Sequence, residues 1–224
     1  MPKDIIPNFL LSKPSRRFNP YAHWKTYKDG DILFQSDERV ERWEAHPDGI
    51  IVDRNGSLFI NGETAQSERE REREREMWHA HSRGFIVRIA NKFLVNGKEL
   101  VYEGEWDDWR SHPEGVVIEK GDQLLLNGEK MLYDDERGEW DGHIEGVIVQ
   151  IENQILLNGE LLLYEGSFDT WLPHPRGVIV QKDNMLILNN QKVIYEGEIG
   201  EWASHPNGII IRKNNLWMFC KIPD

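Results

Sequence analysis

The segment WRSHPEGVVIEKGDQLLLNGEKMLY, residues 109–133, contains the unit from which this chain is built. The unit begins with a Trp, a His three residues later and a Gly three residues after that, and three short apolar runs follow. This motif occurs six times; the first interval is 35 residues, and every later one is 31. Such a period indicates a repeat architecture in which each unit packs against its neighbours. The motif residues are Trp43, His46, Gly49, Trp78, His81, Gly84, Trp109, His112, Gly115, Trp140, His143, Gly146, Trp171, His174, Gly177, Trp202, His205 and Gly208.

Two turn signals divide each unit into strands. In the quoted copy, Gly121-Asp122 separates the first two apolar runs and Asn127-Gly128 separates the second from the third. Asn-Gly between apolar runs is a strong hairpin signal, because a type I′ turn needs positive φ at both positions. The pattern predicts an antiparallel meander of three strands per unit, and it leaves open whether the segment around the Trp adds a fourth. The Asn-Gly signal recurs at Asn61, Asn96 and Asn158, with Asn189-Asn190 as a variant.

The expected strands are almost continuously apolar, as in residues 178–180 and 209–211. This composition is typical of strands covered on both faces. The two-residue hairpins exclude a parallel solenoid, and a β-trefoil would show three repeats. The pattern resembles that of β-propellers in general, without matching a specific propeller family. This resemblance implies an all-β, six-bladed β-propeller with three- or four-stranded antiparallel meander blades.

The two ends of the repeat array are complementary. The last repeat stops at Phe219-Cys220-Lys221, before its third strand, whereas residues 31–34 resemble residues 192–195 and precede the first motif. We therefore expect an N-terminal strand to pair with the C-terminal repeat and close the ring, which protects sheet edges. The predicted organisation is a basic N-terminal extension at residues 1–30 and a single propeller at residues 31–224.

The first repeat departs from the pattern where its third strand is expected. Residues 64–76 stand there, and the run from Ser67 to Met77 alternates Glu and Arg. A helix would place like charges four residues apart, which is unfavourable. We interpret this run as a solvated edge strand or loop, with a docking site for a charged partner as the alternative.

Charge limits the classes of partner. The 224-residue chain has a formal net charge of −12; residues 1–30 carry +4, so the remainder carries −16. An acidic body disfavours nucleic acids and anionic membrane surfaces. We expect the basic extension to fold back onto the body rather than reach a partner. Cys220 is the single cysteine, so we expect no disulfide within the chain, and no apolar run is long enough to cross a membrane. We also expect a cytoplasmic protein that is a monomer and has no cofactor.

The recurring His and Trp residues have structural interpretations. Six blades would hold the motif histidines too far apart to share one metal ion, so we expect them to bond backbone carbonyls at the turns between blades. The motif tryptophans are interpreted as wedges between blades. His79 and His81 would share a face of an extended strand, which makes this pair a weak candidate metal site. Trp24 lies in the extension, where we expect it to pack within the tail.

Trp106, Asp107 and Asp108 form the candidate ligand site. An aromatic ring beside carboxylates suits a sugar, through stacking and hydroxyl hydrogen bonds. No catalytic motif such as Gly-x-Ser-x-Gly, a phosphate loop or His-Glu-x-x-His occurs, so we do not expect an enzyme.

The two residues between each Trp and His vary from repeat to repeat, whereas the framework recurs. We therefore predict a non-enzymatic scaffold that presents variable loops to a protein partner. A lectin-like module that binds glycans is the alternative. A propeller hydrolase with its site over the central channel is the second alternative.

Overall fold

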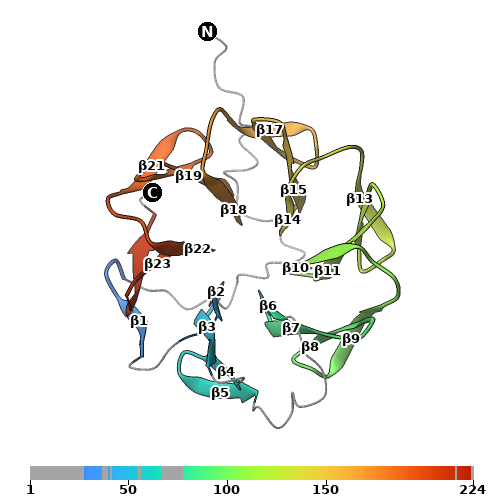
Figure 1. The fold of residues 1–224 in the computed structure, drawn as a ribbon, viewed down its shortest axis with the longest axis horizontal. Coiled ribbons are helices and arrows are strands. Elements are labelled where there is room, and N and C mark those ends of the chain that lie inside the picture. Colours follow the sequence, from blue (N-terminus) through green and yellow to red (C-terminus); the bar gives the residue numbers. More distant parts are fainter. Residues whose placement is uncertain are drawn as a thin grey trace. The chain divides into compact units, whose positions relative to one another are not determined.

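The computed structural model describes residues 28–36, 40, 42–54, 57–66, 78–214 and 216–222. Within them, all regular elements are β-strands, and these form six four-stranded antiparallel sheets, one for each sequence repeat (Figure 1). The predicted fold class is confirmed: the chain has the all-β architecture of a six-bladed β-propeller. The blades have four strands rather than three, because the segment around each motif Trp forms a strand of its own.

The chain forms two compact units, each with three blades. The first unit, residues 106–198, contains β10 (Asp108–His112), β11 (Gly115–Lys120), β12 (Gln123–Leu126) and β13 (Lys130–Asp134); β14 (Trp140–His143), β15 (Gly146–Ile151), β16 (Gln154–Leu157) and β17 (Leu161–Glu165); and β18 (Thr170–His174), β19 (Gly177–Lys182), β20 (Met185–Leu188) and β21 (Lys192–Glu196).

The second unit lies, within the described residues, in 28–105 and 199–222. It contains β2 (Arg42–His46), β3 (Gly49–Arg54), β4 (Ser57–Ile60) and β5 (Glu63–Gln66); β6 (Trp78–His81), β7 (Gly84–Ile89), β8 (Lys92–Val95) and β9 (Glu99–Glu103); and β1 (Ile32–Gln35), β22 (Glu201–His205), β23 (Gly208–Lys213) and β24 (Leu216–Lys221).

The predicted pairing of an N-terminal strand with the last repeat is confirmed. The strand order of that sheet is β1-β24-β23-β22, so β1 takes the place of the missing strand. Ile32 lies opposite Met218, and the Phe34 and Trp217 rings meet edge to face at 5.3 Å. The backbone N–H of Lys221 also donates to Asp29 Oδ1. That residues 31–224 form a single domain stays a prediction, and residues 1–27 of the extension, including Trp24, lie outside the described residues.

The first repeat has a complete fourth strand, β5, although its sequence does not have the apolar run found in the other repeats. β5 pairs with β4 and completes the four-stranded blade, although its residues, Glu-Thr-Ala-Gln, are not an apolar run. Backbone pairing to an apolar neighbour is enough to hold this edge strand. The alternating Glu-Arg run at residues 67–77 lies outside the described residues, and its interpretation stays a prediction.

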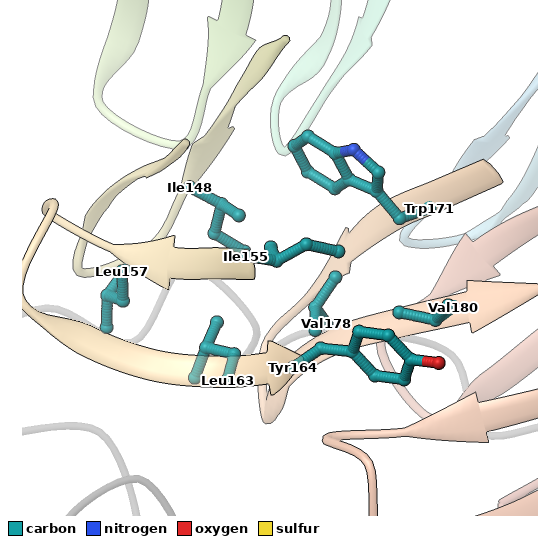
Figure 2. Close-up of a cluster of buried hydrophobic side chains, with 8 residues drawn as sticks. All are labelled: Ile148, Ile155, Leu157, Leu163, Tyr164, Trp171, Val178 and Val180. Carbon is teal, nitrogen blue, oxygen red and sulfur yellow. The ribbon is translucent and has the colours of Figure 1, made fainter. Parts of the chain in front are cut away.

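Neighbouring blades share apolar clusters. Figure 2 shows one of them in the first unit, where side chains of β15, β16 and β17 meet side chains of β18 and β19 in the next blade. Burying each of these large side chains contributes about 1.5–3 kcal/mol. The near-continuous apolar strands noted in the sequence thus serve two interfaces, one on each face of the blade. The cluster contains Ile148, Ile155, Leu157, Leu163, Tyr164, Trp171, Val178 and Val180.

A side-chain clamp joins the two turns of a blade. Asn158 begins the second turn with a φ of 53°, and its Oδ1 accepts from the Val147 N–H at 3.0 Å. Its Nδ2 donates to the Glu145 carbonyl at 3.1 Å, in the turn between the first two strands. A Cβ on Gly146 would lie 2.0 Å from Asn158 Oδ1, which explains why the third motif residue is Gly. The same pair of bonds is made by Asn61, Asn96, Asn127 and Asn189.

Replacing Gly146 by Ala is expected to lower the free energy of unfolding by about 2–4 kcal/mol. The methyl group would collide with Asn158, and a φ of 141° strains any residue that has a Cβ. Gly121→Ala is the control, because Gly121 has a φ of 60° and no atom within 4 Å of the added Cβ; it should cost about 1 kcal/mol. Urea unfolding of the full chain measures both, and equal losses would contradict the clamp.

Candidate functional site

The motif histidines belong to the scaffold. In each of the six, Nδ1 accepts a hydrogen bond from the backbone N–H two residues later, at 3.1–3.2 Å. A backbone N–H can only donate, so a neutral ring carries its proton on Nε2. His143 Nε2 lies 3.0 Å from the carbonyl oxygen of His174 in the next blade and donates to it. This bond joins β14 to β18 in the neighbouring blade.

The histidines are buried as neutral rings. Burial lowers the pKa of His112, His143 and His205 to about 4, although the backbone carbonyl that each faces raises it in part. Burial likewise lowers the pKa of His46. Since Nδ1 of each ring accepts a backbone hydrogen bond, and His143 Nε2 also donates one, these neutral rings belong to the fold at neutral pH.

We expect the chain to lose stability as the pH falls from about 7 to about 5. In unfolded chain a His has a pKa of about 6.5, so between that value and 4 the unfolded state binds more protons than the folded state, and the free energy of unfolding decreases with falling pH. Thermal unfolding at several pH values measures this slope. His143→Gln removes one of these groups and should reduce the slope while lowering stability at pH 7. A melting temperature that does not change between about pH 7 and about pH 5 would contradict the assignment.

The motif tryptophans are also used within the fold. Trp140 and Trp171 are 5% and 6% exposed, and each indole N–H donates at 3.2 Å to a side chain of the preceding blade, Glu119 and Gln150 respectively. Trp78 donates to Asp53 in the same way. Trp43 donates instead to Glu201, which Arg212 holds with two bonds of 2.8 and 3.0 Å. The indoles of Trp78, Trp140 and Trp171 therefore act as buried wedges with a polar anchor and present little ring surface to a ligand.

The pair of residues on either side of the motif Trp differs from blade to blade, and in the first unit most of these residues line a groove. Its volume is about 460 Å³, within the range of ligand pockets. It lies along β10, β14 and β18, the strands that contain the motif Trp in three successive blades. The lining residues are Asp108, Arg110, Glu119, Gly138, Glu139, Trp140, Asp141, Trp171 and Leu172.

The groove is acidic, with one resident cation. Arg110 Nη1 donates to Asp108 Oδ2 at 2.7 Å, and its guanidinium carbon lies 5.2 Å from the centroid of the Trp140 ring. Glu119 is bound by the almost fully buried Arg137. Glu139 is exposed and has no ion-pair partner among the described residues. With four carboxylates and Arg110, the lining carries a formal charge of −3.

The predicted site of Trp106, Asp107 and Asp108 is only partly brought together. Asp108 lines the groove. Asp107 caps a turn instead: its N–H donates to the Glu119 carbonyl, and its Oδ2 accepts from the Gly121 N–H at 2.8 Å. Asp169, two repeats later, makes the same pair of bonds in its own blade, which marks the role as structural. Trp106 is half-buried and is not among the lining residues.

The predicted metal pair lies in the second unit. His79 Nδ1 is 3.0 Å from Glu44 Oε1, and His81 Nδ1 accepts from the Arg83 N–H. Burial alone would raise the pKa of Glu44, but His79, Arg42 and the Ala80 N–H together lower it. Across the described part of the chain, no group of three or more His, Cys, Asp or Glu side chains is placed to hold a metal ion. Metal binding by the two histidines stays a prediction.

Sequence reasoning missed Glu139, and it placed Asp141 and Leu172 only among the variable residues between Trp and His, without naming them as site residues. They flank motif tryptophans in the two repeats that follow Asp108, so the signal was the comparison of these flanking positions between repeats. No protein-family model, no curated protein and no solved structure matches this chain. Among the described residues, no helix is long and apolar enough to cross a membrane.

Proposed function

We propose that the protein is a non-enzymatic scaffold that binds another protein through the groove along β10, β14 and β18. One observation carries this proposal: the residues that recur in every repeat are used inside the fold, whereas the groove is lined largely by residues that do not recur. A surface made from the non-repeating positions of a repeat scaffold is asymmetric. It therefore suits one macromolecular partner better than several identical small ligands.

The burial of the tryptophans weighs against the glycan alternative. A sugar stacks on an exposed aromatic face, whereas Trp140 and Trp171 are only 5% and 6% exposed, and the Arg110 guanidinium lies over the Trp140 ring. In the same groove, Asp108 and Glu119 are each engaged by an arginine, which disfavours the hydrolase alternative at these two carboxylates. The half-buried Leu172 instead gives the groove an apolar contact of the kind found in protein interfaces.

The proposal predicts that Leu172→Asp disrupts partner binding. The full chain, its Leu172→Asp variant and a Leu162→Asp control would be compared by affinity capture from a lysate of the source organism, and binding of the captured protein would then be measured with purified components. Leu162 is exposed on β17 of the same unit and is absent from the groove. We expect Leu172→Asp to weaken binding at least about tenfold, as for a central contact, and Leu162→Asp to leave it unchanged.

Thermal unfolding of the three proteins establishes that they are folded. A partner that binds the Leu172→Asp variant as well as the parent chain would contradict the assignment of the groove. If a panel of glycans raised the melting temperature while no protein bound, the lectin alternative would replace the proposal.

A further inference from the structure

The groove is specialised in the middle one of its three blades. The residues before and after the motif Trp are both acidic in one repeat alone, at Glu139 and Asp141. In the preceding blade the same positions hold Asp108 and Arg110, which pair with each other at 2.7 Å. In the following blade they hold Thr170 and Leu172, which carry no charge. The negative charge of the groove is therefore concentrated around Trp140.

The groove already contains one cationic side chain, that of Arg110, and its contacts show how a second cation would be bound. Arg110 donates a hydrogen bond to the Asp108 carboxylate, and its guanidinium carbon lies 5.2 Å from the centroid of the Trp140 ring. This arrangement combines an ion pair with a cation–π contact, which is the usual way in which proteins bind guanidinium and ammonium groups. Glu139 and Asp141 offer the same carboxylate chemistry in the same groove.

The apolar part of the lining suits a long side chain. Leu172 and Trp171 line the groove together with the carboxylates. Lys and Arg place an aliphatic stem on apolar surface while their charged end remains beside polar groups. A phosphate backbone or an anionic lipid surface would instead meet a lining of formal charge −3.

We propose that the groove binds a basic segment of the partner protein, with a Lys or Arg side chain entering beside Glu139 and Asp141. This inference rests on the proposed function, because it names the chemistry of the segment that the scaffold recognises. The negative formal charge of the groove lining is complementary to the positive charge of such a segment. The chain's own residues 1–27 are also basic, and the experiment below distinguishes them from a partner segment.

The experiment uses short overlapping peptides from the captured partner, each made with its Lys and Arg residues and again with Gln in their place. Binding to the full chain would be measured by fluorescence anisotropy at low and high salt. The test variant is Glu139→Gln/Asp141→Asn. The control is Glu129→Gln/Glu160→Gln, which makes the same change in net charge at two exposed positions outside the groove of the same unit.

We expect at least one basic peptide to bind the parent chain and the control with similar affinity. The test variant and the Gln-substituted peptide should each weaken binding about tenfold or more, and high salt should weaken it as well. Equal losses in the test and control variants would overturn the inference, because they would show attraction to overall charge alone. If Leu172→Asp abolished partner binding while Glu139→Gln/Asp141→Asn left it intact, the inference would fail and the proposed function would stand.

A last variant replaces Lys3, Lys13, Arg16, Arg17 and Lys25 by Gln in the full chain. Under the proposal these residues do not occupy the groove, so peptide affinity should stay the same. A clear rise in affinity would overturn the proposed occupant and assign the groove to the chain's own basic segment.

Discussion

The position of one proton on each motif histidine is the constraint on which the rest of the structure depends. A backbone N–H occupies Nδ1, so the proton lies on Nε2 and can bridge to the next blade, as His143 does with the His174 carbonyl. Protonation of the ring would place a charge where burial disfavours it. The same turn is held from the other side by Asn158, whose bonds require Gly146. His143, Gly146 and Asn158 thus hold the same turn together, which explains why His, Gly and Asn recur together in five of the repeats.

The sequence predicted the fold more fully than the site, for physical reasons. Turn residues with positive φ and apolar runs are local signals, so the meanders and the closing strand β1 could be predicted. The fourth strand could not be decided, because segments such as Trp109-Arg-Ser-His112 are mostly polar between their two motif residues and become strands by pairing with an apolar neighbour. β5 in the first blade is held in the same way.

The site was harder to predict because it is assembled across repeats. Asp108 was found through its neighbours in sequence, whereas Glu139 reaches the same groove from the equivalent position one repeat later, and Leu172 from the other side of the motif Trp two repeats later. Asp107 was selected with Asp108 because both are acidic, yet it caps a turn as Asp169 does. In a repeat protein, the residues of one site come from different repeats, and residues adjacent in sequence often have different roles.

The pairing of β1 with β24 also sets an order of events during synthesis. β1 precedes five complete blades in the sequence, so its partner β24 is made much later. At about 5–20 residues per second, the wait between them lasts roughly 10–40 s. Until β24 is made, β1 has no strand of its own sheet to pair with. Exchange of this strand between neighbouring nascent chains would compete with closure of the sheet.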